Sequence, residues 1–355
     1  MLRSVIIGTG SFIPDHIVSN KAFENHQFYE ADGSKLYKRN ESIISKFCEI
    51  TGIHERRYAT SGQNCSHLGF LSAQAALAHS RIDPETLDYI IVAHNFGDVS
   101  INSNRTTQVP SIASRVKNML GIVNPDCVAY DILFGCPGWI EGLIQADCFI
   151  RVGMARRCLV IGAETLSRVI DPHDRDSMIF ADGSGAAILE ASSTEDRGIV
   201  SYKTRTYSAE SDLLRMNTSN SQFTNNPHDQ FLKMDGRKVY EFALTNVPVL
   251  MKEVIEKANL HLSDIKKVLV HQANEKMDNA ILQRLFKLYD VEFVAGNLMP
   301  MTIGWLGNSS VATVPTLFDL VARRKLEGHE ICSGDHIIMA SVGAGMNVNA
   351  VVYKY

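Results

Sequence analysis

The 355-residue sequence has no stretch of about 18 consecutive apolar residues, the length that a helix needs to cross a bilayer. Its beginning, MLRSVIIGTGSFIP, lacks the long apolar core and the small-residue cleavage site of a secretory signal peptide. It is expected to form a short strand and a turn. We therefore expect a protein without a membrane span.

The sequence also has little excess charge of either sign. Its 35 Lys and Arg residues stand against 39 Asp and Glu residues, so the formal net charge is −4 at pH 7. This balance gives no support for nucleic-acid binding, because such proteins usually present a broad basic surface. Any cationic site must be local.

Cysteine pairs at metal-binding or redox spacing are missing as well. The seven cysteines include no CxxC, and an odd number does not suggest a disulfide framework or a zinc site. Several lie in apolar stretches, as reduced buried thiols do. We therefore expect free thiols and a reducing, cytoplasmic location. The cysteines are Cys48, Cys65, Cys127, Cys136, Cys148, Cys158 and Cys332.

What the sequence does contain is an alternation of strand and helix patterns, which favours an α/β fold. The apolar stretch at 87–93 is typical of a strand with helices on both faces. Residues 208–229 are rich in Asn and Ser and are expected to form a poorly ordered loop. Helices are predicted at 65–80, 111–120, 137–152, 235–258, 275–288 and 308–326. Further strands are predicted at 4–8, 127–132, 157–162, 265–271, 335–341 and 347–353, and residues 180–190 are expected to form a Gly-rich turn that leads into a strand.

Two parts of the chain look like copies of one plan. Residues 134–164 and 306–345 each read as turn, helix, basic connector and strand, and LDYIIVAHNF at 87–96 is echoed by IKKVLVHQAN at 265–274. We infer an internal duplication into two α/β halves, 1–190 and 191–355.

Cys136 is placed between Gly135 and Pro137, directly before a predicted helix. At a helix N-terminus, unsatisfied N–H groups and the helix dipole favour the thiolate and lower the pKa from about 8.5. The same N–H groups can bind an oxyanion. Gly135 and Gly138 are expected to leave room for an acyl group near the backbone. A packed, unreactive thiol explains the position equally well.

Two further polar residues stand at the ends of predicted elements. His271 ends an apolar strand, where α/β folds place functional groups, although a hydrogen-bonded core histidine is the competing interpretation. Asn308 is expected just before or at the start of a central helix, where Asn is a common N-cap. Its amide can also donate a hydrogen bond to a thioester carbonyl. The residues alone leave these alternatives open.

Taken together, the motifs resemble the thiolase-fold condensing enzymes, most closely the β-ketoacyl-[acyl-carrier-protein] synthase III family. They occur in the family's order over nearly the whole chain. The matching stretches are GTGSFIP from Gly8, ITGIHERRYA from Ile50, VPSIASRVKNMLGI from Val109, DILFGCPGW from Asp131, DPHDRDSMIFADGSGAA from Asp171, VHQAN from Val270, GNSSVATVP from Gly307 and SVGAGM from Ser341. The resemblance implies an α/β, thiolase-like five-layered αβαβα fold built from two duplicated halves.

The resemblance also implies a catalytic triad of Cys136, His271 and Asn308. Cys136 would accept an acyl group from a thioester, and the other two would stabilise the enolate of a second thioester. The backbone N–H groups of Cys136 and Gly345 match the family's oxyanion hole. Implied partners are a second copy of the chain, in a homodimer, and an acyl carrier protein or CoA that delivers the thioesters. No cofactor is implied.

The sequence departs from the family's bacterial fatty-acid enzymes near the substrate tunnel. Val109 stands where these enzymes often have a Phe that floors the partner subunit's acyl pocket. Lys46 and Ile50 replace the Trp and Arg that sandwich the adenine of CoA. A basic rim at the tunnel mouth is kept, which suits an acyl carrier protein. The residues of this rim are Arg175, Arg237 and Lys276.

The predicted function is acyl transfer to Cys136 and then Claisen condensation with a malonyl-type or β-keto thioester, in fatty-acid-like or dialkylresorcinol-type lipid biosynthesis. The dialkylresorcinol-forming branch is suggested by an insertion at Asn25–Glu41. One alternative is an acyltransferase of the same fold that acts on an alcohol or amine. A hydroxymethylglutaryl-CoA-synthase-like aldol reaction would need a Glu where only Asp98 is found. A non-catalytic partner subunit is disfavoured by the retained triad.

Overall fold

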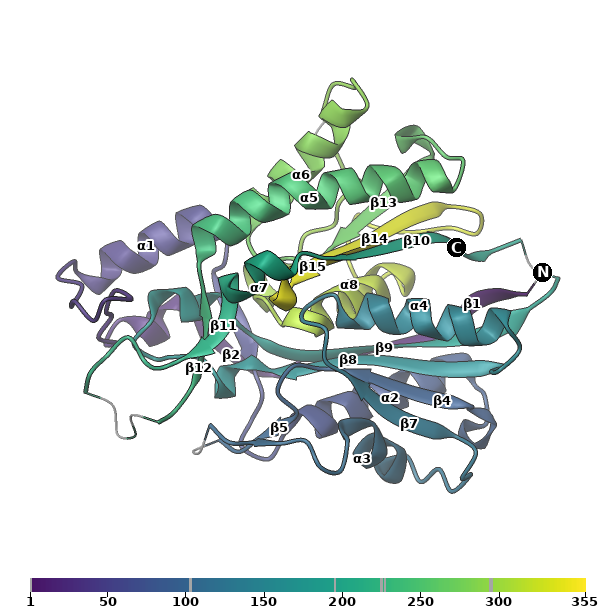
Figure 1. The fold of residues 1–355 in the computed structure, drawn as a ribbon, viewed down its shortest axis with the longest axis horizontal. Helices are drawn as coiled ribbons and strands as arrows, with labels where there is room; N and C mark the ends of the chain where they lie inside the picture. Colours follow the sequence, from purple (N-terminus) through teal and green to yellow (C-terminus); the bar gives the residue numbers. More distant parts are fainter. Residues whose placement is uncertain (1, 102–103, 195, 224–225, 227, 294–295) are drawn as a thin grey trace.

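Two β-sheets organise the chain (Figure 1), which the structure, a computed structural model, describes at residues 2–101, 104–194, 196–223, 226, 228–293 and 296–355. In the first sheet the strand order is β1 (Arg3–Phe12), β9 (Asp182–Ser192), β8 (Arg157–Thr165), β4 (Tyr89–Ala93) and β7 (Val128–Ile132). In the second it is β10 (Gly198–Thr206), β15 (Asn347–Lys354), β14 (His336–Gly343) and β13 (Ile265–Val270).

Helices form three layers around these sheets, as Figure 1 shows. Helices α4 (Gly138–Arg151) and α8 (Thr313–Ala322) lie between the sheets and share one apolar core with strands of both. Helices α2 (Cys65–Ser80) and α3 (Ile112–Met119) cover the outer face of the first sheet. Helices α5 (Gly236–Lys257) and α6 (Glu275–Leu288) cover the second. The result is the predicted αβαβα arrangement.

The strand pairing of the second sheet repeats that of the first. The parallel pair β4–β8 continues into the antiparallel strands β9 and β1, and the parallel pair β13–β14 continues into β15 and β10. Phe318, on α8, is almost completely buried between the sheets, as its apolar surroundings in the sequence predict. The boundary predicted at residue 190 lies within the last residues of β9.

The smaller elements surround one end of the sheets. Helix α1 (Asn40–Thr51) begins at the end of the Asn25–Glu41 segment, which is packed through the buried Phe28 and a bridge between Tyr29 and Lys35. The remaining short elements are β2 (His16–Ser19), β3 (Glu55–Tyr58), β5 (Asp98–Val99), β6 (Thr106–Thr107), α7 (Ile303–Leu306) and a ribbon of β11 (Leu214–Asn217) and β12 (Phe231–Met234). No described helix is both long and apolar enough to cross a membrane.

Two predicted elements differ from the structure. Residues 208–229 are not simply a loop, because they contain a 3-10 turn at Ser208–Leu213 and strand β11. The part of that prediction at residues 224–225 and 227 lies outside the described residues. The predicted 308–326 helix begins only at Thr313, because Ser310 has a φ of 53°, in the left-handed region that an α-helix does not use. Asn308 is therefore not the N-cap of this helix.

Candidate active site

A cavity of about 80 Å³ is lined by Cys136, His271 and Asn308. Cys136 precedes α4, His271 directly follows β13, and Asn308 follows α7. The three predicted site residues are therefore brought together by both halves of the fold. Most of the other lining is apolar and includes Phe96, Leu166, Phe180, Leu214, Leu232, Met234, Val239 and Met277.

Two turns press against each other beside the Cys136 sulfur. A Cβ added to Gly135 would lie 2.6 Å from the Ala344 nitrogen, and one added to Gly343 would lie 2.5 Å from the Cys136 nitrogen. A Cβ on Gly138 would come within 3.0 Å of the Ala93 side chain. The glycines therefore allow close packing of the polypeptide around the cavity that Gly135 itself lines, and the expectation that Gly135 and Gly138 leave room for an acyl group stays a prediction.

The same contacts affect the predicted oxyanion hole. Gly343 and Ala344 line the cavity, whereas Gly345 does not. Gly345 lies one residue further along the turn, with a φ of 76° and with Asn347 Nδ2 only 2.8 Å from the place of a Cβ. Ala344, rather than Gly345, is thus the residue of this turn that neighbours Cys136 in the cavity.

Burial determines the ionisation of the thiol. It raises the pKa of Cys136 to about 11, while a hydrogen bond from the Ser310 hydroxyl acts in the opposite direction. Our sequence-based expectation of a lowered pKa was therefore wrong in sign. The loss of hydration outweighs the favourable position before α4, because a buried thiolate is poorly solvated.

The other two site residues, His271 and Asn308, differ in how their polar side-chain atoms are hydrogen-bonded. Burial lowers the pKa of His271 to about 4, so its imidazole is neutral at pH 7, and its Nδ1 has no hydrogen-bond partner among the described residues. The Oδ1 atom of Asn308 accepts a 2.8 Å hydrogen bond from the Ser310 nitrogen. The NH2 group of the Asn308 side chain is therefore the end left available to a ligand.

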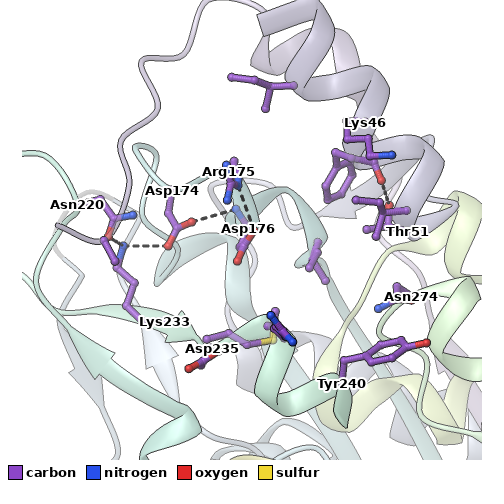
Figure 2. A pocket seen from close by; sticks show the side chains of 18 of the residues that line it. Lys46, Thr51, Asp174, Arg175, Asp176, Asn220, Lys233, Asp235, Tyr240 and Asn274 are labelled. Carbon is purple, nitrogen blue, oxygen red and sulfur yellow. Dashed lines mark hydrogen bonds and ion pairs between the residues drawn. The ribbon is translucent and has the colours of Figure 1, made fainter. Parts of the chain in front are cut away.

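A second, much larger pocket of about 1310 Å³ adjoins this cavity (Figure 2). Met234 lines both spaces. The large pocket is bounded by α1, the β11–β12 ribbon and the first turn of α5, and it is referred to below as the mouth pocket. Lys46, Ile50, Arg175 and Arg237 all line it.

The predicted rim cations each have an acidic neighbour. Arg175 lies 3.2 Å from Glu30, and Arg237 lies 3.0 Å from Glu241. Lys276, in the first turn of α6, is 3.9 Å from Glu49 on α1. The structure thus places Arg175 and Arg237 in the mouth pocket and Lys276 on the neighbouring helix, but all three are exposed and partly neutralised.

Val109 lies apart from the cavity of its own chain. It precedes α3, and 87% of its surface is exposed. Asp98, the acid considered for an aldol reaction, accepts hydrogen bonds from Ser66 and forms an ion pair with Arg115 at 2.5 Å. No group of three potential metal ligands is found in the part of the chain that the structure describes.

Three polar residues behind the thiol were not predicted from the sequence. Asn95, at the end of β4, and Ser310 line the cavity, and Glu164, at the end of β8, bonds to Asn95. Asn95 lies two residues beyond the apolar stretch 87–93, at the same end of the repeated strand pattern that His271 occupies in the second half. This internal repeat was the signal that could have identified Asn95.

Comparison with known proteins decides the family. The model for 3-oxoacyl-[acyl-carrier-protein (ACP)] synthase III matches residues 130–208, and that for its C-terminal domain matches residues 255–355. The β-ketoacyl-[acyl-carrier-protein] synthase III of Erythrobacter litoralis is 32% identical, and that of Pasteurella multocida is 31% identical, each over all of both chains. The chain belongs to the β-ketoacyl-[acyl-carrier-protein] synthase III family. It is therefore a condensing enzyme of the acyltransferase class.

Solved structures of synthase III enzymes agree with this assignment. The 3-oxoacyl-[acyl-carrier-protein] synthase III of Aquifex aeolicus has a TM-score of 0.80 and 28% identity, and the match covers 99% of this chain and 100% of that one. The priming β-ketosynthase of the R1128 polyketide pathway has a TM-score of 0.80 and 25% identity, with 99% and 96% coverage. The thiolase-like fold of the chain is thus shared with enzymes of this family over its whole length.

Proposed function

We propose that this synthase III family member transfers an acyl group from a thioester to Cys136 and condenses it with a second thioester. The observation that carries the proposal is the presence of Cys136, His271 and Asn308 around one buried cavity. Thiol, imidazole and amide in an apolar enclosure suit covalent acyl transfer followed by stabilisation of an enolate.

In the first step the Cys136 sulfur forms a bond to the thioester carbonyl carbon. The carbon–sulfur bond to the incoming carrier breaks, and the Cys136 proton ends on the departing thiol. The developing oxyanion is bound by the N–H groups of Cys136 and Ala344, with Ala344 in place of Gly345. Support comes from the contact between the two turns that contain these residues.

In the second step a malonyl-type thioester loses CO2 and becomes an enolate. The amide NH2 of Asn308 and an N–H of the neutral His271 ring bind the enolate oxygen. The enolate carbon then attacks the acyl carbon, a carbon–carbon bond forms, and the bond to the Cys136 sulfur breaks. Neutral donors suit this step because a charged imidazolium is disfavoured in a buried site.

The thioester carrier is proposed to be an acyl carrier protein, with acyl-CoA as a possible donor. Two observations on the mouth pocket support this preference. Arg175 and Arg237 line it, and the positions expected to clamp the adenine of CoA are occupied by Lys46 and Ile50, neither of which is aromatic. The reaction requires no cofactor other than the thioesters. The seven free cysteines support a reducing compartment, such as the cytoplasm.

The working form is proposed to be a homodimer in which Val109 of one subunit lines the acyl pocket of the other. This valine is 87% exposed, and Leu133, beside the edge strand β7, is 59% exposed. Such exposed apolar side chains support a surface that a second subunit would cover. The dialkylresorcinol-forming branch is proposed on the basis of the inserted segment Asn25–Glu41 alone. In that branch the second substrate is a β-keto thioester and the product is cyclised.

The decisive experiment is intact-protein mass spectrometry after mixing with matched acyl-CoA and acyl-carrier thioesters, with Cys136→Ala as the control. We expect one acyl adduct on Cys136 and its discharge, with a new carbon–carbon bond, when malonyl or β-keto thioester is added. Discharge only to alcohols or amines would instead identify an acyltransferase. No adduct with any thioester would identify a non-catalytic subunit and overturn the proposal.

A further inference from the structure

Ser310 contacts two members of the triad directly. Its hydroxyl donates a 3.2 Å hydrogen bond to the Cys136 sulfur, and its main-chain nitrogen donates to Asn308 Oδ1 at 2.8 Å. Ser310 is only 4% exposed and has a φ of 53°, a conformation uncommon for any residue but glycine. A serine held in this strained conformation beside a nucleophile indicates a role in the site.

A chain of hydrogen bonds fixes the direction of the Ser310 hydroxyl. Asn95 Nδ2 donates to Glu164 Oε2 at 2.7 Å and to Ser310 Oγ at 3.1 Å, and the Asn95 main-chain nitrogen donates to the same carboxylate oxygen at 2.9 Å. Because a carboxylate accepts hydrogen bonds, the Asn95 amide turns its NH2 group, and not its oxygen, toward Glu164. Because Ser310 Oγ already accepts a hydrogen, its own hydrogen is directed to sulfur.

We propose that Glu164, Asn95 and Ser310 form a buried relay in which Ser310 is a positioning residue that stabilises the Cys136 thiolate as it forms. The proposal rests on the function proposed above and adds residues outside the family's triad. No proton is passed along the relay. Its effect is to present one oriented O–H donor to the sulfur, both before attack and when the condensation returns the thiolate.

The arrangement also explains how a buried acid can lie so near a nucleophilic sulfur. The ionisable groups that face this region are His271 on the cavity side of Cys136, and His94 and Asp182 around Glu164. A carboxylate in direct contact with the thiol would oppose thiolate formation by charge repulsion. The Asn95 amide and the Ser310 hydroxyl lie between the acid and the sulfur. Glu164 therefore orients a hydrogen-bond donor toward the sulfur instead of repelling the thiolate directly.

The test is the rate at which iodoacetamide alkylates Cys136 as a function of pH, followed by peptide mass spectrometry. In Ser310→Ala, loss of one hydrogen bond to an anionic group should lower the alkylation rate of Cys136 about tenfold at each pH. This displaces the rate profile by about one pH unit. Ser310→Gly should show the same displacement although glycine removes the backbone strain. Ser309→Ala is the matched control, because the neighbouring Ser309 hydroxyl lies 3.4 Å from Thr313 and outside the relay.

A second variant tests the relay itself. Asn95→Ala should slow alkylation by releasing the Ser310 hydroxyl, and the Asn95→Ala/Ser310→Ala double variant should be no slower than Ser310→Ala alone. Wild-type profiles in Ser310→Ala and Ser310→Gly, or single effects that multiply in the double variant, would overturn the relay. Alkylation needs no thioester, so failure of the wild-type protein to take up acyl groups would refute the proposed function separately.

Discussion

Cys136 and His271 line the same cavity, and burial shifts their pKa values in opposite directions, to about 11 and about 4. At neutral pH the pair is therefore an uncharged thiol beside an uncharged imidazole. A thiolate–imidazolium pair would require two buried charges at once, which desolvation disfavours.

This relationship predicts slow alkylation of Cys136 in the resting enzyme. Since only the thiolate reacts, Cys136 should be alkylated by iodoacetamide at pH 7 more slowly than the exposed Cys148 and Cys332. The Cys136 rate should rise about tenfold per pH unit between pH 7 and 10. Quantitative peptide mapping over time measures all three thiols in one sample. Preferential labelling of Cys136 at pH 7 would show that it rests as a thiolate.

The two proposed donors to the enolate should be needed for condensation and not for acyl uptake. In His271→Ala and Asn308→Ala we expect acylation of Cys136 within about tenfold of the wild-type rate and condensation reduced about 10²- to 10³-fold, as for loss of an oxyanion donor. Acyl uptake is followed by intact mass and condensation by product formation. Near wild-type condensation in either variant would remove that residue from the enolate step.

Asn308→Asp provides a sharper test of the same site. The aspartate is nearly isosteric and can still accept the hydrogen bond from the Ser310 nitrogen through one oxygen. Its second oxygen would be an acceptor, and often charged, where the enolate needs a donor. Condensation should therefore fall at least as far as in Asn308→Ala at pH 8. If the aspartate variant condenses normally, the amide NH2 is not the donor.

The resemblance singled out the three residues that line the cavity, but it could not predict their ionisation. The motif around Cys136 places it before a helix, and that local feature argues for a low pKa. The opposite shift comes from enclosure of the thiol in a cavity between the two halves of the chain, which local sequence does not report. Likewise, Gly345 and Ala344 are equally plausible oxyanion donors in SVGAGM until the contact with Cys136 is known.

The β11–β12 ribbon illustrates a different limit. The segment that joins its two strands is polar and rich in Asn and Ser, and the ribbon is held by Lys233, which donates hydrogen bonds to Asp171, Asp174 and Asn220. These partners are far apart in the chain, so the pattern around 208–229 indicated a loop. By contrast, the helices α2 and α6 have the predicted bounds of 65–80 and 275–288, because the Ala- and Leu-rich composition of α2 and the apolar periodicity of α6 are local features.

Glu164 should make the protein less stable as the pH rises. Burial raises its pKa from 4.5 to about 7, so between these values the folded protein holds a proton that the unfolded chain has lost. The stabilising contribution is fully present below pH 4.5 and is lost as the pH rises through 7, by about 3 kcal/mol for this group. Urea unfolding of wild-type protein and Glu164→Gln at pH 5 and 8 measures the difference.

The glutamine variant should unfold with a weaker dependence on pH, because it cannot ionise but keeps an oxygen that accepts from Asn95. Asp182, with a pKa raised to about 6 by burial, contributes in the same direction in both proteins and so provides the common background. Identical pH dependence in wild-type and Glu164→Gln would show that Glu164 does not titrate in this range.

Val109→Phe should shorten the preferred acyl chain if the partner subunit's Val109 floors the pocket. The larger side chain would occupy space for three to four carbons, and each buried CH2 of substrate is worth about 0.8 kcal/mol. Acylation rates for a series of chain lengths measure the preference, with size-exclusion chromatography to establish the dimer. An unchanged chain-length profile in a dimeric variant would refute this role of Val109.

The mouth pocket should select the carrier through its charge. Arg237 is 88% exposed and pairs with Glu241 on the next helical turn, an ion pair that contributes little to stability at the surface. Its guanidinium is thus available to the acidic surface of a carrier protein. We expect acyl-carrier thioesters to react faster than the matching acyl-CoA at low salt, since steering by opposite charges raises the association rate.

Arg237→Glu should reduce kcat/KM for the carrier thioester far more than for a short pantetheine thioester, which lacks the protein surface. Arg324→Glu is a matched control, because Arg324 is also exposed and ion-paired but does not line the mouth pocket. The advantage of the carrier thioester should shrink as salt is added, because exposed charges are screened over about 8 Å at physiological ionic strength. Equal efficiency of carrier and CoA thioesters at every salt concentration, or equal losses in both variants, would show that Arg237 does not select the carrier.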